Sequence, residues 1–332
     1  MSNKKRRLSG VKPTGQLHVG NYFGAMKQFV DLQDEYESFI FVADIHALNR
    51  IQNLDAGNNA RQEQIDNTLH VICGYLAIGI DPEKTVLFKQ SDILAHPYVA
   101  WIFNALTSMP YLMRAHAFKD AEAKSKEISV GTFVYPMLMA SDILLYDPQV
   151  VPVGKDQKQH IEYARDTAQK FNRIFGETFT LPEAIIIDEV ESVPGLDGQK
   201  MSKSYGNTIP LFATPEETRA LIMGAPMDSK GIAEAKSPDD YPIYKIFKLF
   251  ASAEEDDAMR AQFLNGGVGY GEIKTQIAEK INTALAPMRE RYQNFMSDRA
   301  TVEAILASGK ERASIAADAK LTAVRKAVGL LS

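Results

Sequence analysis

Two short segments of the sequence carry residue types that could hold a phosphate-bearing ligand. The first, PTGQLHVGN at residues 13–21 (the glycine segment), combines glycines with His18 and Asn21. Glycines let the backbone approach a ligand closely, and an imidazole and an amide can donate hydrogen bonds to phosphate oxygens. Short patterns of this kind also arise by chance, so taken alone the segment leaves a purely structural glycine turn equally open.

The second segment, GQKMSKSYGN at residues 198–207 (the lysine loop), places Lys200 and Lys203 three positions apart among serines and glycines. Phosphoryl and nucleotidyl transfer needs mainly positioned positive charge where negative charge develops. We therefore expect a mobile cationic loop able to clamp a triphosphate. A solvated loop of lysines and serines is the alternative when this segment is taken alone.

The elements that must position these segments follow from apolar runs. RRLSGV, SFIFVAD, KTVLFKQ, VVPVG and AIIIDEV predict strands, and longer helical patterns separate them. This alternation predicts an α/β fold, a Rossmann-like doubly wound parallel sheet, whose ligands lie outside the carboxyl ends of the strands. The glycine segment falls there, since it follows RRLSGV and opens an amphipathic helix.

The pattern becomes helical after residue 210. Thr214 and Glu217 form a predicted capping box with Pro215 at the first helical position. One long helix shows an apolar face made by Ile273, Ile277, Ile281, Leu285, Met288, Tyr292 and Phe295. We predict a catalytic domain at 1–213, with a helical insertion at about 94–148, and an all-helical domain at 214–332. The polar segment 225–242 reads as a connection, and the last helices could pack back on the first domain.

Composition excludes several classes of protein. A net charge of −5 argues against nonspecific coating of nucleic acid. The single cysteine, Cys73, cannot form a disulfide framework and is expected in the core. No apolar run reaches the roughly 18 residues that a membrane span needs. The basic start of the chain is not followed by the apolar stretch of a signal peptide. We expect a cytoplasmic protein. No metal site is expected, because the histidines lack metal-ligand spacing at His70, His96, His116 and His160.

Positive charge gathers in the last hundred residues at Lys310, Arg312, Lys320, Arg325 and Lys326. This cluster could contact RNA or could be the solvated face of a helix, and the sequence leaves both open.

Together, the glycine segment and the lysine loop resemble the paired signatures of class I aminoacyl-tRNA synthetases. Residues 18–21 (His-Val-Gly-Asn) stand where that class has His-Ile-Gly-His. The resemblance implies that His18 and Asn21 contact ATP phosphates, that Gly20 packs under the adenine, and that Lys200 and Lys203 neutralise the leaving pyrophosphate. The implied reaction is attack of an amino-acid carboxylate on the α-phosphorus of ATP, followed by acyl transfer to the terminal ribose of a tRNA.

Three further stretches resemble the bacterial tryptophanyl branch of that class: VADIHAL (42–48), YPMLMASDILLYD (135–147) and VPVGKDQKQHIEYARD (151–166). The resemblance continues through the C-terminal helices and so covers nearly the entire chain. It implies L-tryptophan, ATP and tRNA(Trp) as substrates, with Mg²⁺ accompanying ATP and no zinc. It also implies a homodimer whose helical domain binds the anticodon.

The same resemblance implies a tryptophan site in which Asp142 accepts the indole N–H. The lining residues would be Leu8, Met139, Ile143, Val151 and Val153, with His46, Tyr135 and Gln157 at the polar end. A buried acceptor among apolar and methionine side chains suits an indole, which offers one donor and no acceptor. An ordinary core helix whose aspartate pairs internally is the alternative for this stretch alone.

The implied ATP site includes the signature residues and several flanking positions. Its members are Lys12, Pro13, Thr14, Gly20, Asn21, Lys119, Gly154, Lys155, Asp156, Val193, Lys200, Met201, Ser202, Lys203 and Ser204. The chain departs from the family pattern at four places: Leu8 replaces a common aromatic, Lys12 a common Gln, Lys155 a common Glu, and Ala121 an expected lysine.

Three other kinds of protein could carry similar segments. A tyrosyl-tRNA synthetase shares both signatures and differs in its substrate pocket. Adenylyltransferases share the first signature, but they are usually shorter and lack this second loop. A synthetase-like RNA-binding paralogue would have lost charging, against which the intact His18, Lys200 and Lys203 speak.

Overall fold

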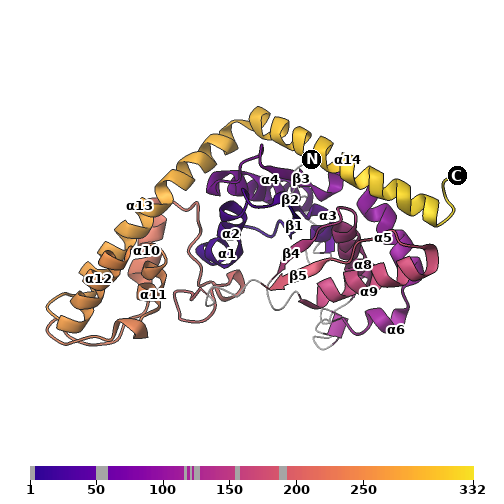
Figure 1. The fold of residues 1–332 in the computed structure, drawn as a ribbon. Coiled ribbons are helices and arrows are strands. Elements are labelled where there is room, and N and C mark those ends of the chain that lie inside the picture. The colour runs from indigo at the N-terminus through magenta and orange to yellow at the C-terminus, as the bar shows by residue number, and fades with distance from the viewer. Residues whose placement is uncertain are drawn as a thin grey trace.

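A computed structural model describes residues 4–49, 59–115, 118–119, 122, 128–153, 158–186 and 193–332. These residues form a five-stranded sheet in the order β3-β2-β1-β4-β5, and every pairing is parallel (Figure 1). The strands are β1 (Arg6–Val11), β2 (Glu37–Val42), β3 (Thr85–Lys89), β4 (Val150–Val153) and β5 (Glu183–Ile186). With β1 at the centre the chain winds outward in both directions, so the predicted doubly wound sheet is confirmed.

Alternate side chains of the strands enter two separate cores. Phe39 and Phe41 of β2 pack in one core, and Ile40 and Val42 pack in the other. The first core is closed by α5 (Ala95–Leu106), α8 (Val130–Leu144) and α9 (Lys158–Phe175), and the second by α4 (Ala60–Ile78). Burial on both faces explains why apolar residues follow one another in FIFV of β2 and VLF of β3 without polar alternation.

The helix predicted after the glycine segment is present without a break from residue 19 to residue 31. It consists of α1 (Val19–Asn21), a π-helical turn (Tyr22–Met26) and α2 (Lys27–Asp31). The π turn within it was not predicted. A π turn leaves the regular ladder of backbone hydrogen bonds, and such turns are frequent at functional sites.

The chain from 214 onward is mostly helical, as α10 (Pro215–Gly224), α11 (Pro242–Lys248), α12 (Ala253–Asn265), α13 (Tyr270–Ser297) and α14 (Arg299–Ala327). The predicted capping box is present: the Thr214 hydroxyl accepts from the backbone N–H of Glu217, and the Glu217 carboxylate accepts from that of Thr214. The apolar face of α13 is buried, with Ile273, Ile277 and Ile281 each at 0% exposure. It packs in the same core as α4, so one core joins the sheet region to the helical region.

Helix α14 crosses the edge of the sheet beside β3 and α5 (Figure 1). Gly309 meets the backbone of Leu87, where an added Cβ would lie 1.8 Å from the carbonyl oxygen. Arg312 donates to the carbonyl of Pro82, and Lys320 forms a 2.6 Å ion pair with Asp147. The C-terminal positive charges therefore serve partly to attach α14 to the sheet region, which neither sequence alternative anticipated.

The polar segment 225–242 folds against the helices instead of hanging between them. Lys236 is 1% exposed, and its ammonium donates to the carbonyls of Gly231, Ile232 and Glu234 at 3.1, 3.3 and 3.0 Å. The carboxylate of Asp228 accepts from the hydroxyls of Tyr241 and Tyr270. Expecting a plain connection here missed a buried cation that the segment's own carbonyls satisfy.

Cys73 is buried, as predicted, and burial raises the pKa of its thiol to about 11. Within the described ranges, no helix is both long and apolar enough to cross a bilayer.

Candidate functional site

One cavity of about 920 Å³ opens at the carboxyl ends of β1 and β4 and contains most of the residues expected to bind ATP or tryptophan. The expected residues that line it are Leu8, Lys12, Thr14, Gly20, Asn21, His46, Tyr135, Met139, Asp142, Ile143, Val151, Val193, Lys200, Met201 and Lys203. The two sets of residues were taken from separate stretches of sequence, and the fold brings them to a single hollow.

The remaining expected residues have different positions. Pro13, His18, Ser202, Ser204 and Lys119 do not line the cavity; His18 lies just behind it, and the side chains of Lys119 and Ser204 are exposed. Gly154, Lys155, Asp156, Gln157 and Ala121 lie outside the described residues, as does the side chain of Val153.

His18 is held in a buried position at the start of α1. Its side chain is 6% exposed, and within the described part of the chain its Nδ1 has no hydrogen-bond partner. Burial, and next the positive charge of Lys203, lowers the pKa of this imidazole to about 4. His18 is therefore neutral at pH 7 and can offer a hydrogen bond without carrying charge.

Gly20 joins the glycine segment to the lysine loop. A Cβ on Gly20 would lie 3.0 Å from Nδ1 of His18 and 3.1 Å from Cβ of Met201. The backbone N–H of Gly20 also points to Sδ of Met201 at 3.2 Å. A side chain at this position would be tight between the imidazole and the methionine, so the two segments pack directly on each other here.

The lysine loop has a hydrogen-bonded base. The side-chain oxygen of Asn207 accepts from the backbone N–H of Ser202 at 2.8 Å, and its NH₂ donates to Asp197 at 2.7 Å and to the carbonyl of Lys200 at 3.2 Å. Gly195 permits this contact, because a Cβ there would lie 2.2 Å from the Asn207 amide nitrogen. Asn207 thus holds the two ends of the loop together, a role that was not predicted from the sequence.

The two lysines of the loop differ in position. Lys203 donates to the carbonyl oxygen of Thr14, which ties it to the glycine segment. Lys200, like Lys203, is exposed and lines the cavity. Both ammonium groups lie on the loop that packs over His18, so positive charge gathers at one end of the cavity.

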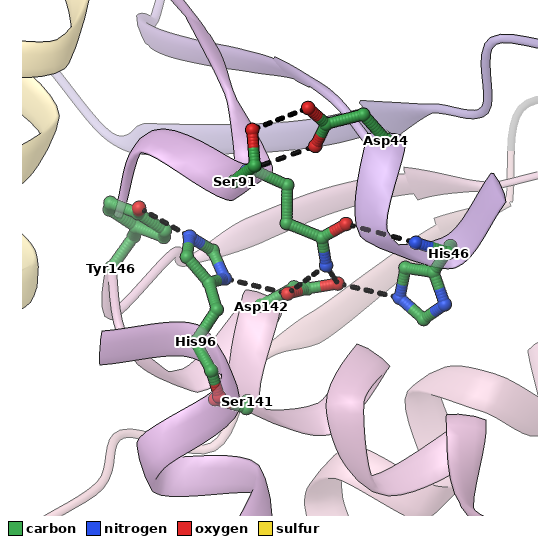
Figure 2. Close-up of polar contacts among 8 residues, drawn as sticks. Asp44, His46, Ser91, His96, Ser141, Asp142 and Tyr146 are labelled. Atoms are coloured by element: carbon green, nitrogen blue, oxygen red, sulfur yellow. Dashed lines mark hydrogen bonds and ion pairs between the residues drawn. The ribbon is translucent and has the colours of Figure 1, made fainter. Parts of the chain in front are cut away.

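At the other end, Asp142 on α8 is 1% exposed and surrounded by N–H donors (Figure 2). Its Oδ1 lies 2.6 Å from Nδ1 of His96, and its Oδ2 lies 2.9 Å from Nε2 of His46. The amide nitrogen of Gln90 reaches both oxygens, at 2.8 and 2.9 Å. Asp142 therefore does pair with side chains of the protein itself, as the alternative of an ordinary core helix predicted. The same carboxylate nevertheless lines the cavity, as the tryptophan site requires.

The charge state of Asp142 follows from these donors. Burial by itself would raise the pKa of the carboxyl, but the electrostatic attraction of His96 and the hydrogen bonds from His46 and His96 outweigh it and lower the pKa to about 2. Asp142 is thus an anion at pH 7 and a strong acceptor.

His46 lies between Asp142 and Tyr135, against whose ring it packs edge to face with 6.2 Å between centroids. Of the side chains that donate to Asp142, His46 lines the cavity, whereas Gln90 and His96 are 0% exposed and lie behind it. The sequence reasoning missed Gln90 and His96, and it gave Tyr146 no role. The available signal was a polar glutamine directly after the buried strand β3, since side chains at strand ends reach ligand sites.

No group of three or more His, Cys, Asp or Glu side chains comes together as a metal site among the described residues. The donor groups at the cavity are instead imidazoles, amides and ammonium groups, whose partners are carboxylates and phosphates.

Comparison with known proteins gives concordant matches. Residues 2–286 match the family model described as tRNA synthetases class I (W and Y). The tryptophan–tRNA ligase of Fusobacterium nucleatum is 43% identical over 328 residues, covering 98% of this chain and 98% of that protein. That of Rhodopirellula baltica is 44% identical over 325 residues, covering 98% and 99%. The crystal structure of tryptophanyl-tRNA synthetase from Campylobacter jejuni complexed with ADP and tryptophan superposes with a TM-score of 0.92 at 40% identity, covering 98% of this chain and 100% of that one.

Proposed function

The chain belongs to the class I tRNA synthetases of the tryptophan and tyrosine type, and from that premise we propose how its cavity carries out the reaction of a tryptophan–tRNA ligase. The enzyme activates L-tryptophan with ATP, giving tryptophanyl-adenylate and pyrophosphate. It then transfers the tryptophanyl group to tRNA(Trp) and releases AMP. We assign tryptophan to one end of the cavity and ATP to the other. This assignment rests on one observation: the cavity holds a buried anionic acceptor at one side and two lysines at the other.

At the acceptor end, Asp142 receives the indole N–H. Leu8, Met139, Ile143 and Val151, which line the cavity, surround the ring with apolar atoms. We assign Val153 to the same ring pocket. An indole fits because it offers one donor and otherwise apolar edges, so it satisfies the carboxylate without burying an acceptor of its own. His46, Tyr135 and Gln157 bind the amine and carboxylate of the amino acid.

At the lysine end, the triphosphate of ATP lies between the glycine segment and the lysine loop. Neutral His18 and the NH₂ of Asn21 donate to phosphate oxygens; the side-chain oxygen of Asn21 is already used by the backbone N–H of His18. When the tryptophan carboxylate attacks the α-phosphorus, negative charge grows on the departing pyrophosphate. Lys200 and Lys203 stabilise that charge, which lowers the barrier.

The other ATP contacts follow from the same placement. Gly20 passes under the adenine, and the remaining contacts come from Lys12, Pro13, Thr14, Lys119, Gly154, Lys155, Asp156, Val193, Met201, Ser202 and Ser204. ATP enters as its Mg²⁺ complex, and zinc takes no part. Support comes from the C. jejuni relative, whose structure contains ADP and tryptophan, and from donor groups suited to phosphate.

We assign residues 1–213 to the catalytic domain, with a helical insertion at about 94–148, and residues 214–332 to a helical domain that binds the tRNA anticodon. The core shared by α4 and α13 makes these two parts one cooperative unit. Truncation at 216 would expose that core, so tRNA recognition is better tested with charge changes on the helical surface than by deletion.

The enzyme acts in the cytoplasm as a homodimer. Exposed apolar side chains support the dimer: Leu94 and Trp101, seven positions apart at the start of α5 and within it, are 79% and 74% exposed, and Met109 at the start of α6 (Met109–Leu112) is 67% exposed. Large exposed apolar side chains are typical of a surface that another chain covers.

The deciding experiment is amino-acid-dependent ATP–pyrophosphate exchange with tryptophan, tyrosine and phenylalanine. We expect exchange with tryptophan, dependent on Mg²⁺ and unchanged by a zinc chelator. Exchange driven by tyrosine would indicate the tyrosyl activity, and no exchange with any of the three would indicate an RNA-binding paralogue. Loss of activity on zinc removal would overturn the metal assignment.

A further inference from the structure

The contacts of Asp142 continue into the protein as a chain of buried groups (Figure 2). Nε2 of His96 lies 2.9 Å from the hydroxyl of Tyr146, and Nδ1 of His96 lies 2.6 Å from Oδ1 of Asp142. Tyr146 and His96 are both 0% exposed. A polar chain of this kind is expensive to bury unless each member is satisfied, and each member here has a partner.

The proton positions along this chain follow from its chemistry. Burial, and next the charge of Asp142, raises the pKa of the Tyr146 hydroxyl, so Tyr146 keeps its proton and donates it to Nε2 of His96. Because Nε2 of His96 accepts this hydrogen bond, the N–H on Nδ1 is the one that points at Asp142. The hydroxyl of Ser141 also donates to the backbone carbonyl of His96 at 2.7 Å, which ties α8 to α5 beside the carboxylate.

Gln90 approaches the carboxylate from a second element. It begins the short 3₁₀ turn η3 (Gln90–Asp92) directly after β3, and its own side-chain oxygen accepts from the backbone N–H of His46. The neighbouring Ser91 donates twice to Asp44, from its backbone N–H at 2.9 Å and from its hydroxyl at 2.5 Å (Figure 2). The turn that carries Gln90 is therefore attached to α3 (Asp44–Ala47), which carries His46.

These contacts leave little room for another donor on Asp142. A carboxylate has about four lone-pair sites, and His96, His46 and the two contacts of Gln90 already use them. An indole N–H can be accepted only if one donor withdraws. His46 is the donor that lines the cavity, and it holds Oδ2, whereas Gln90 and His96 act from behind.

We propose that Tyr146, His96 and Gln90 are positioning residues that set the selectivity for an N–H-bearing ring by fixing the Asp142 carboxylate, and that the indole N–H takes the Oδ2 position held by His46. This inference rests on the proposed function, in which Asp142 is the indole acceptor. None of the three positioning residues lines the cavity, so they act on tryptophan only through Asp142.

The test compares tryptophan with β-(benzothiophen-3-yl)alanine, an isostere in which sulfur replaces the indole N–H. Pyrophosphate exchange gives kcat/KM for each, and their ratio reports the hydrogen bond to Asp142 independently of ring shape. For the unchanged enzyme we expect a preference for tryptophan of about 10- to 100-fold, since the isostere cannot donate a hydrogen bond to the charged acceptor.

Three variants probe the chain behind Asp142. His96→Leu removes the N–H donor, and we expect the ratio to fall about tenfold, mainly through a higher KM for tryptophan. His96→Asn can place an amide N–H where Nδ1 lies, so it should keep most of the ratio. Tyr146→Phe removes one hydroxyl and should lower the ratio about fivefold. The KM for ATP should stay unchanged in all three.

A matched control is Tyr111→Phe. Like Tyr146→Phe, it removes one tyrosine hydroxyl and its hydrogen bond, but at a position away from Asp142. The Tyr111 hydroxyl donates to Asp166 at 2.6 Å, and neither residue lines the cavity. This variant should keep the unchanged ratio. A purely structural role for His96 and Tyr146 would lower stability or total activity and leave the ratio unaltered.

The outcomes separate the inference from the function on which it rests. If Asp142→Ala leaves the ratio unaltered, the indole assignment fails. If Asp142→Ala abolishes the preference but His96→Leu and Tyr146→Phe do not change it, the positioning role is overturned and the function stands. If His96→Leu does not fold, Tyr146→Phe decides alone, because it removes a single oxygen atom from the core.

Discussion

The two ends of the cavity are built on opposite plans. At the acceptor end, Asp142 is 1% exposed and every lone pair of its carboxylate faces an N–H group. At the lysine end, Lys200 and Ser204 are exposed, and Nδ1 of His18 has no hydrogen-bond partner within the described residues. One end is complete as folded, and the other has donors that a phosphate would satisfy.

The two ends differ because the charge that each must stabilise behaves differently during the reaction. The acceptor for the indole carries the same charge throughout the reaction, so the fold can bury it and hold it with Gln90 and His96. The lysines act on charge that appears only as pyrophosphate leaves, and both side chains are exposed. The comparison predicts that changes at the lysine end reduce rate, while changes at the acceptor end reduce selectivity and stability.

The largest effect should come from replacing both Lys200 and Lys203 with alanine. We expect the rate of adenylate formation to fall about a thousandfold, because two positive charges are removed where negative charge develops. The dissociation constant for tryptophan should change by less than about twofold, since neither lysine contacts the acceptor end. Pre-steady-state adenylate formation and equilibrium binding measure the two quantities.

Lys245→Ala is the matched control, because Lys245 is an exposed lysine on α11 in the helical region. It should leave pyrophosphate exchange unchanged. Equal losses of rate and of tryptophan binding in the double variant would contradict the separation of the two ends.

The next largest effect should come from Asp142→Ala. We expect kcat/KM for tryptophan to fall about 10- to 100-fold or more, with the KM for ATP little changed. The free energy of unfolding should also fall by about 2–5 kcal/mol, because buried N–H donors lose their acceptor. Exchange assays with the three aromatic amino acids and urea unfolding test both parts. A variant that still prefers tryptophan by the original margin would make Asp142 a structural residue.

A smaller effect, also confined to the acceptor end, should come from Gly309→Ala. The new Cβ would overlap the carbonyl oxygen of Leu87, so α14 or β3 must shift, at about 1–3 kcal/mol of unfolding free energy. Leu87 lies three residues before Gln90, so we expect the KM for tryptophan to rise several-fold and the KM for ATP to stay constant. Steady-state exchange kinetics measure both constants.

Gly271→Ala provides the control for this substitution. Gly271 lies in α13, and a Cβ there would meet no atom within 4 Å. Alanine should be neutral or stabilise the helix by up to about 1 kcal/mol. If Gly309→Ala raises the KM for ATP as much as the KM for tryptophan, the effect of this substitution is not confined to the acceptor end.

The smallest effect concerns the protonation of His18. Its folded-state pKa of about 4 lies below the ordinary 6.5, so the folded protein binds fewer protons than the unfolded chain between these values. The resulting stability is fully present above pH 6.5 and is lost as the pH falls toward 4. Histidine NMR, with His18→Gln to assign the signal, should show no titration of His18 between pH 7.5 and 5.5.

Lys203→Ala should raise the pKa of His18 only in part, because burial is the larger cause of the shift and remains in place. A His18 signal that titrates near pH 6.5 in the unchanged protein would show that the lysine end is more hydrated than the structure indicates.

Much of the fold was predictable because its signals are local. RRLSGV coincides with β1, and each of the other four apolar runs overlaps its strand with boundaries that differ by at most two residues, as far as the described residues extend. The capping box at Thr214 and the apolar face of α13 depend on neighbours three or four residues apart, and both are present. The π turn at Tyr22–Met26 could not be predicted in this way, because no capping side chain or apolar period marks it in the sequence.

The candidate site was predictable to the extent that motifs carry it. The glycine segment, the lysine loop and the stretch around Asp142 each pointed to residues that line one cavity. Gln90, His96 and Asn207 were missed because each acts by supporting another residue, at separations of 52 and 46 positions for the contacts with Asp142. Residue type alone does not reveal such a pairing.

The sequence by itself determined the alternation of strands and helices, the order of the signature residues and the presence of suitable donors and acceptors. Periodicity and short motifs are encoded within a few residues, so they can be read without knowing the fold. Only the tertiary structure decided that Asp142 is an anion held by Gln90 and His96, that Gly20 lies between His18 and Met201, and that Lys236 is buried. Burial and charge state depend on groups from distant parts of the chain, and these meet only when the sheet and helices pack.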